Sequence, residues 1–217
     1  MSISSPKPAL EGLRILDLSQ VAAGPYATMF LGFMGAEVIK IESLSRMDIN
    51  RGKARPGPDD LRVYPNGDPG ERPWNRTAHH VHRNINKQSL TIDLATDQGR
   101  ELLLDLVKVC DVLVENYRGS VMDRLGLGYD VVSSQNPQLI YLKISSQGAT
   151  GPEANYGSLG STLEQTGGLA SITGYEDGLP LLTNLVYPDP VVGILSFGAL
   201  MTALRSRLKS GKGCLVD

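Results

Sequence analysis

Short apolar segments alternate with helix-like segments along most of the chain. Residues 13–18 (LRILDL) have the apolar run of a buried strand, residues 26–34 follow with a helix-like composition, and residues 37–42 (EVIKIE) form a second strand-like run. Two strands joined through a helix are expected to run parallel, because the chain must cross over the sheet between them. The pattern therefore predicts a β-α-β unit at the start of the chain.

The same alternation continues toward the C-terminus. Further strands are expected at residues 89–94, 111–116 and 139–145, and residues 214–217 look like the opening of another strand. Helices are expected at residues 98–109, 121–125, 129–135, 161–172 and 190–209. The predicted fold class is α/β, with a Rossmann-like, doubly wound and mainly parallel sheet in one large domain over residues 1–217.

One segment interrupts this rhythm. Residues 50–83 are rich in Pro, Gly, Asp and Arg and contain His79, His80 and His82, so we expect a long irregular loop within the domain. Loops of this length usually carry function or are mobile. No carboxylate or cysteine stands at a spacing that would complete a metal site with the histidines. We therefore interpret them as a solvated cluster and predict no metal.

Composition limits the class of protein. With 217 residues, 41% hydrophobic and 20% charged residues and a net charge of -2, the chain is typical of a globular domain without affinity for nucleic acid or an anionic membrane. Cys110 and Cys214 are expected to be reduced thiols. The apolar stretch at residues 191–204 is too short to span a membrane. No leader peptide is evident, so we expect a cytoplasmic protein.

The first strand-helix turn, residues 19–25, carries a single glycine instead of a G-x-G-x-x-G fingerprint. NAD and FAD are therefore unlikely ligands, since their pyrophosphate turn needs its glycines. The chain also has neither a P-loop nor a G-x-S-x-G elbow. Basic residues that follow strands are alternative phosphate ligands. They are Arg46, Arg51, Lys87, Arg118 and Arg124.

Asp189 stands in the run Tyr-Pro-Asp-Pro directly before a long apolar segment. An aspartate followed by proline at this position indicates a helix N-cap with proline as the first helical residue. The helix dipole there favours the ionised carboxylate. A positioned carboxylate is also a suitable nucleophile for acyl transfer. From the residues alone, Asp189 is a cap, a nucleophile, or both.

Several ordered motifs together resemble the family III CoA-transferases, the group that includes formyl-CoA and carnitine CoA-transferases and the 2-methylacyl-CoA racemases. The matching runs are LEGLRILDL at 10–18, AGP at 23–25, GAEVIKIE at 35–42, DVLVENY at 111–117, LGLGY at 125–129 and GATGP at 148–152. The matches extend in order from residue 10 to residue 217, which makes the resemblance specific.

The resemblance implies a role for particular residues. Asp189 matches the aspartate that attacks an acyl-CoA thioester to form a mixed anhydride and then an enzyme-CoA thioester. Coenzyme A is a substrate in this chemistry, and no tightly bound cofactor is expected. The positions that match the family's CoA contacts are Val21, Ala22, Ile92, Ala95, Asn116, Tyr117, Arg118 and Arg124.

Departures from the formyl-CoA transferases bear on the substrate. Gln20, Ala22 and Ala95 replace polar or basic residues of that branch, and a tyrosine of its acyl site falls at Gly160. These changes predict a roomier pocket for a larger acyl group. The racemase branch uses a histidine that aligns within residues 155–163, where this chain has none, so isomerisation is the weaker alternative.

Family members are considerably longer than this chain and continue into a small second domain. They form interlocked homodimers. The resemblance therefore implies an incomplete family fold that lacks the second domain. Besides an active transferase acting on an acyl-CoA and a carboxylic acid, a CoA-binding subunit or inactive fragment that needs a partner chain remains open.

Overall fold

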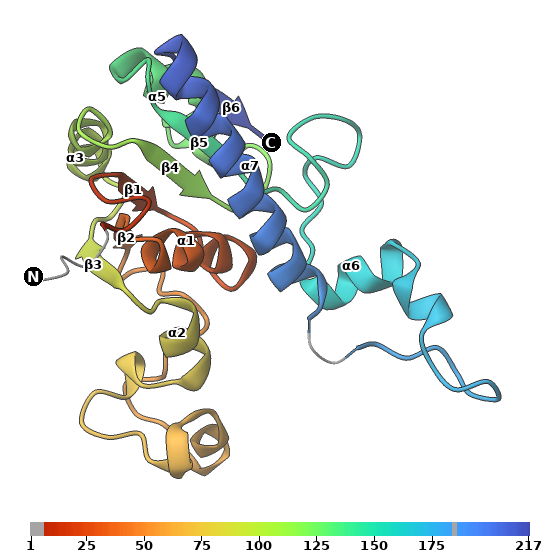
Figure 1. Ribbon diagram of the computed structural model, residues 1–217. Helices are drawn as coiled ribbons and strands as arrows, with labels where there is room; N and C mark the ends of the chain where they lie inside the picture. The colour runs from red at the N-terminus through yellow and green to blue at the C-terminus, as the bar shows by residue number, and fades with distance from the viewer. Residues whose placement is uncertain (1–6, 184–185) are drawn as a thin grey trace, which may run out of the picture.

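The computed structural model describes residues 7–183 and 186–217. Six strands form one sheet in the order β3-β2-β1-β4-β5-β6, and all five neighbouring pairs run parallel (Figure 1). The strands are β1 (Arg14–Asp17), β2 (Glu37–Glu42), β3 (Lys87–Thr91), β4 (Val112–Glu115), β5 (Ile140–Lys143) and β6 (Cys214–Val216). The predicted α/β class, the parallel sheet and the strand at residues 214–217 are confirmed. The order is that of a Rossmann-like sheet.

Helices cover both faces of the sheet. One face packs against α1 (Ala23–Phe33) and α7 (Pro188–Ser210), and its core includes Leu31, Leu200 and Leu204. The other face packs against α3 (Asp97–Val107), α4 (Val121–Arg124) and α5 (Tyr129–Gln135). The central strands β1 and β4 are apolar on both faces because both faces are covered.

The edge strand β3 starts earlier than its apolar residues suggest. The sequence predicts a strand over residues 89–94, whereas β3 pairs with β2 from Lys87 to Thr91. Four of its five residues are exposed. An edge strand is selected by hydrogen bonding to its one neighbour, and its side-chain pattern is therefore a weak guide to its limits.

The segment over residues 50–83 contains regular structure. It holds three short 3-10 helices, Pro58–Val63, Pro65–Gly67 and Pro73–Asn75, and ends in α2 (Ala78–Arg83). The side chain of Thr77 caps α2 by accepting a hydrogen bond from the His80 N–H. His80 is buried, and burial lowers its pKa to about 4, so the prediction of a solvated histidine cluster is wrong for this residue.

The helix α7 begins before Asp189. Tyr187 is the N-cap residue, Pro188 occupies the first turn, and Asp189 already lies inside the helix. The prediction that Asp189 is the N-cap is wrong, because Pro188 rather than Pro190 takes the early position that suits a fixed φ. The carboxylate nevertheless stays in the first turn, near the positive end of the helix dipole.

The length of α7 also corrects a prediction. With 23 residues, α7 is long and apolar enough to cross a membrane by length and composition alone, although residues 191–204 had suggested too short a span. In this structure α7 packs along α1 and the sheet through Leu200, Ala203 and Leu204. Ile194 and Leu195 remain exposed on its other side.

Residues 160–183 extend away from the sheet (Figure 1). They contain α6 (Gly160–Thr166) and a 3-10 turn, Leu169–Ile172. The sequence predicts one helix over residues 161–172, but Gly168 adopts a left-handed conformation with φ of 81° and divides it.

Candidate active site

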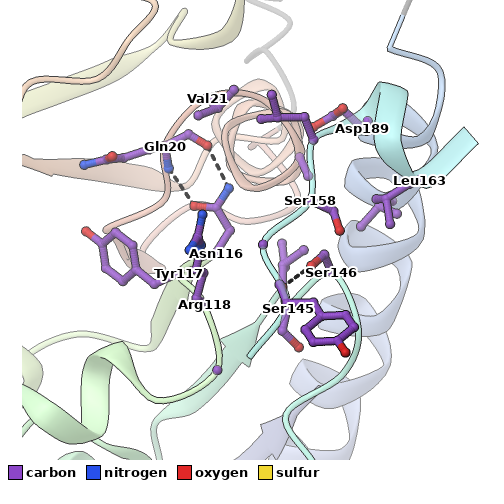
Figure 2. A pocket seen from close by; sticks show the side chains of 18 of the residues that line it. Gln20, Val21, Asn116, Tyr117, Arg118, Ser145, Ser146, Ser158, Leu163 and Asp189 are labelled. Carbon is purple, nitrogen blue, oxygen red and sulfur yellow. Dashed lines mark hydrogen bonds between the residues drawn. The ribbon is translucent and has the colours of Figure 1, made fainter. Parts of the chain in front are cut away.

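A cavity of about 850 Å³ lies at the carboxyl edge of the sheet, where the strand order reverses between β1 and β4. Loops that follow β1, β4 and β5 form its walls together with the first turns of α6 and α7. Figure 2 shows Asp189 and Leu163 on one side and Tyr117 and Arg118 on the other. In doubly wound sheets this edge is where ligands bind.

Asp189 is a half-buried carboxylate in the cavity wall. Burial raises its pKa, and the nearby charge of Arg83 and a hydrogen bond from the Ala23 N–H act in the opposite direction. Its Oδ2 atom is buried and has no hydrogen-bond partner among the residues that the structure describes. Because the Asp189 side chain lines the cavity, its carboxylate can act there as a nucleophile toward a substrate carbon.

Gly160 makes room for that oxygen. A Cβ atom at residue 160 would lie 2.1 Å from Asp189 Oδ2 and 2.2 Å from Val186 Cγ1, closer than atoms can approach. The first turn of α6 can therefore pack against the carboxylate only because residue 160 lacks a side chain. Gly160 was missed as a contact of Asp189, since the sequence suggested only a lost tyrosine of an acyl site there.

The turn between β1 and α1 is held in an unusual conformation. Val21 has a φ of 66°, which is rare for a β-branched residue because its Cβ crowds the backbone. The Asp48 carboxylate accepts a hydrogen bond from the Val21 N–H at 3.0 Å. The Val21 carbonyl oxygen accepts hydrogen bonds from Asn50 Nδ2 at 2.5 Å and from Arg83 at 3.3 Å. The segment at residues 48–83 thus fixes this turn.

The β4 loop holds the same turn from the other side. The Asn116 side chain accepts from the Gln20 N–H and donates to the Gln20 carbonyl, both at 2.7 Å (Figure 2). This amide-to-backbone pair joins the loops after β1 and β4 across the point where the strand order reverses. Asn116 therefore shapes the cavity through its position between the loops.

A buried ion pair lies beneath the turn. Lys87 Nζ donates to Asp17 Oδ2 at 2.9 Å and to the Pro25 carbonyl at 3.1 Å. Thr28 Oγ1 also donates to Asp17, at 2.7 Å. Burial lowers the pKa of Lys87 to about 8. Lys87 is thus committed to structure, and its candidate role as a phosphate ligand is not supported.

The other basic candidates divide into two groups. Arg51 forms a half-buried pair with Glu42 at 2.5 Å and does not line the main cavity. Arg46, Arg118 and Arg124 do line it, and all three are exposed to solvent. One guanidinium group can bind two phosphate oxygens through two parallel hydrogen bonds, so this wall suits an anionic ligand.

The predicted site residues are brought together only in part. Six of the nine predicted contacts line the cavity with Asp189: Val21, Arg46, Asn116, Tyr117, Arg118 and Arg124. Ala22 is buried as the N-cap residue of α1, Ile92 packs in the core, and Ala95 is exposed before α3. These three do not line the cavity.

Other lining residues escaped the sequence analysis. They come mainly from the loop after β5 and from residues 154–163, and include Ile144, Ser145, Ser146, Tyr156, Ser158, Leu159 and Leu163. The position of the β5 loop at the carboxyl edge was the available signal for the first three. For residues 154–163 the available signal was the resemblance, which aligns an acyl-site tyrosine and the racemase histidine with this region.

No histidine lines this cavity within residues 7–183 and 186–217. Among the same residues no group of three or more His, Cys, Asp and Glu side chains is arranged to hold a metal ion. The polar side chains that the described residues offer at the cavity are a carboxylate, arginines, hydroxyl groups and amides.

A Rossmann-like sheet, a cavity at its carboxyl edge and a carboxylate opposite an arginine-lined wall define an α/β protein suited to a nucleotide-like anionic ligand. The chain belongs to CoA-transferase family III, whose family model matches residues 10–217.

Characterised relatives and a solved structure are similar over nearly the whole chain. Succinyl-CoA:glutarate CoA-transferase of Mus musculus is 37% identical over 98% of this chain and 45% of its own length. Formyl-CoA:oxalate CoA-transferase of Bradyrhizobium sp. is 38% identical over 94% of this chain and 44% of its own length. A CAIB/BAIF family protein from Brucella suis superposes with a TM-score of 0.84 at 34% identity, over 98% of this chain and 53% of its own. The chain thus spans about half the length of these proteins.

Proposed function

We propose that this chain carries the nucleophile and the CoA-binding wall of a CoA-transferase, which moves CoA from an acyl-CoA thioester to a carboxylic acid. Family membership supports the class of reaction. The observation that carries the proposal is the Asp189 carboxylate, whose unpartnered Oδ2 sits in the wall of a cavity large enough for a thioester substrate.

In the proposed reaction, an Asp189 oxygen attacks the thioester carbonyl. The C–S bond breaks, the CoA thiolate leaves, and a mixed aspartyl anhydride forms. The thiolate then attacks the aspartyl carbonyl and releases the donor acid, which gives an aspartyl-CoA thioester. The acceptor carboxylate repeats these two steps in reverse order, so that acyl-CoA leaves and the Asp189 carboxylate is regenerated.

The arginine-lined wall supports the placement of CoA. Arg46, Arg118 and Arg124 are proposed to bind its phosphates, while Val21 and Asn116 border the path toward Asp189. The thioester at the end of the pantetheine arm is proposed to extend from that wall to Asp189 in the same cavity. CoA is then a substrate that is exchanged in each cycle.

The acyl group is proposed to be larger than formyl. Gly160 and Ala23 border Asp189 with little side-chain volume, and Leu163 and Val192 supply apolar surface beside it. The similar proteins named above include one whose name specifies succinyl-CoA and glutarate and one whose name specifies formyl-CoA and oxalate. The apolar surface that Leu163 and Val192 add to the cavity favours the larger of these classes of acid.

Further polypeptide is proposed to complete the site. Apolar side chains on α7 are exposed, among them Ile194 at 54% and Leu195 at 67%. An exposed apolar face of this kind marks a protein contact. We propose a homodimer. A complementary second chain, with this chain as its CoA-binding partner, is the alternative.

Chemical trapping tests the nucleophile. The protein is incubated with acetyl-CoA, succinyl-CoA and formyl-CoA in turn, with hydroxylamine present, and its peptides are mapped by mass spectrometry. We expect a hydroxamate at Asp189 with the productive thioester, because hydroxylamine intercepts both the anhydride and the aspartyl thioester.

Two matched variants sharpen this test. Asp189→Asn should lose both transfer and the adduct, whereas Asp130→Asn, an exposed carboxylate on α5, should retain both. Full transfer activity in Asp189→Asn, or an adduct at a different carboxylate, rules the proposed mechanism out.

A further inference from the structure

Arg83 lies at the point where the segment at residues 48–83 meets the nucleophile. It is the last residue of α2, and its guanidinium donates to the Val21 carbonyl at 3.3 Å. The guanidinium carbon lies 5.5 Å from the centroid of the Tyr26 ring, within the range of a cation-π contact. Arg83 is therefore held by two separate contacts, one with Tyr26 of α1 and one with the turn before α1.

The residues that Arg83 contacts lie next to the part of α1 that packs against α7 near Asp189. Tyr26 packs against α7 at Gly193, where a Cβ atom would lie only 2.5 Å from Tyr26 Cβ. Gly193 lies one helical turn after Asp189 in α7. In α1, the N–H of Ala23 donates a hydrogen bond to the Asp189 carboxylate. The guanidinium thus sits over the junction of α1 and α7 that carries the carboxylate.

The charge of Arg83 is not neutralised by a carboxylate at hydrogen-bond distance. None of the ion pairs among the described residues includes Arg83. Its Nε atom is buried without a hydrogen-bond partner in the same part of the chain. By contrast, Arg51 on the same segment is fully engaged by Glu42.

Other ionisable groups lie on the elements around Asp189. Glu164 on α6 is bound by Thr183 and by the Tyr187 N–H. The remaining groups on the elements packed around the carboxylate or across the cavity are Tyr26, Arg46, His82, Arg118, Arg124, Tyr156 and Tyr187. Arg83 is the charged side chain that lowers the pKa of Asp189 against the effect of burial.

We infer that Arg83 is a positioning residue for the transfer reaction, which holds Asp189 as the reactive carboxylate by its charge and fixes the Val21 turn beside it. The inference rests on the proposed role of Asp189. The segment at residues 48–83 then has a role in the reaction, because it brings the Arg83 guanidinium to Tyr26 and the Val21 turn beside Asp189.

Two substitutions separate charge from geometry. Arg83→Gln removes the charge and keeps a donor for the Val21 carbonyl, whereas Arg83→Lys keeps the charge and loses the planar contact with Tyr26. Arg76→Gln is the matched control, because Arg76 belongs to the same segment and pairs with Asp68 at the surface.

The readout is the titration of the Asp189 carboxyl carbon by NMR in protein labelled with ¹³C-aspartate. The resonance is assigned by its absence in Asp189→Asn. We expect the titration midpoint to move upward by roughly half to one pH unit in Arg83→Gln, since an attractive positive charge is lost. Arg83→Lys and Arg76→Gln should stay near the parent value. The acidic limb of the rate of CoA transfer should move with the carboxyl.

Coincident midpoints in Arg83→Gln and the parent protein overturn the inference, as does a uniform loss of rate at every pH without a shift of the limb. The NMR titration does not depend on turnover. If Asp189 is not the nucleophile, Asp189→Asn remains active, and the carboxyl titration still reports on Arg83 alone. Should Arg83→Gln fail to fold, Arg83→Met at the same position provides the uncharged variant with the longer apolar stem retained.

Discussion

At the scale of single residues, the site depends on the missing side chain at Gly160 and the missing hydrogen-bond partner of Asp189 Oδ2 among the described residues. The carboxylate is packed against Gly160, and its Oδ2 atom has no partner among the described residues. Burial raises its pKa, while Arg83 and the Ala23 N–H oppose this effect. The balance leaves a carboxylate that is desolvated on one side and anchored on the other, as a nucleophile requires.

A methyl group at residue 160 should impair transfer more than folding. In Gly160→Ala the new Cβ would lie 2.1 Å from Asp189 Oδ2, so the carboxylate must move. We expect a loss of about 100-fold in the rate of CoA transfer, the size that follows from a displacement near 1 Å. Gly198→Ala is the control, because a Cβ at residue 198 of α7 meets no atom within 4 Å. Equal rates in the two variants would show that the packing at Gly160 is unimportant.

The strained turn at Val21 predicts an unusual effect on stability. Val21→Gly should leave the free energy of unfolding unchanged or raise it by about 1 kcal/mol, because glycine adopts a φ of 66° without steric cost. Val131→Gly, within α5 and with ordinary helical geometry, should instead lose about 0.5–1 kcal/mol. Urea unfolding of both variants measures the contrast. A loss at Val21 as large as that at Val131 contradicts the assigned strain.

At the scale of secondary-structure elements, the carboxyl end of β4 places a polar side chain in the buried part of the molecule. Glu115, the last residue of β4, is buried and accepts a hydrogen bond from the Tyr117 N–H at 2.6 Å. Burial raises its pKa to about 7, although the Tyr117 N–H and Lys143 favour the charged form. The loop that carries Asn116, Tyr117 and Arg118 thus starts on a group that titrates near neutrality.

This burial predicts a pH dependence of stability. A carboxyl whose pKa is higher in the folded than in the unfolded chain contributes stability below its ordinary pKa near 4.5, and that contribution is lost as the pH rises through about 7. The free energy of unfolding of Glu115→Gln, relative to the parent, should therefore rise by roughly 2–3 kcal/mol between pH 4.5 and 8.

Urea unfolding over a series of pH values measures this difference. Glu101→Gln, at an exposed position of α3, should run parallel to the parent protein. If the curve of Glu115→Gln is also parallel to the parent, Glu115 titrates normally in the folded state and the buried assignment is wrong.

Elements whose apolar pattern matches their burial were predictable from the sequence. The strands around Ile15, Val38, Leu113 and Tyr141 are found where their continuous apolar runs indicated. The limits of β3 and the start of α7 were not, because backbone pairing with β2 and the placement of Pro188 decide them. Local sequence carries little information on either effect.

At the scale of the whole molecule, the sequence indicates which residues carry chemistry and the fold decides which of them meet. Asp189 and the residues 116–118 lie far apart in the chain and line one cavity. The contacts of Arg83 and Gly160 with the neighbourhood of Asp189 depend on how α2 and α6 pack, which no spacing motif encodes. The same packing leaves Lys87 without a role as a phosphate ligand, because it is paired with the buried Asp17 side chain.

The exposed apolar face of α7 predicts self-association. Leu195→Glu should shift the protein toward the monomer in sedimentation velocity, because a charge is buried poorly at an interface. Its melting temperature as a monomer should change little, since Leu195 is 67% exposed within the chain. Arg205→Glu, an exposed position on the same helix, should not alter the sedimentation coefficient. A parent protein that sediments as a monomer contradicts the proposed dimer.

Transfer of oxygen to Asp189 tests the central claim most directly. The protein turns over its acyl-CoA donor with an acceptor acid labelled with ¹⁸O in its carboxyl group, and the peptide that contains Asp189 is then sequenced by mass spectrometry. An aspartyl anhydride deposits acceptor oxygen in the aspartate when the new acyl-CoA leaves, so we predict one or two ¹⁸O atoms at Asp189. Turnover without ¹⁸O at Asp189, or with ¹⁸O in a different residue, would contradict the account.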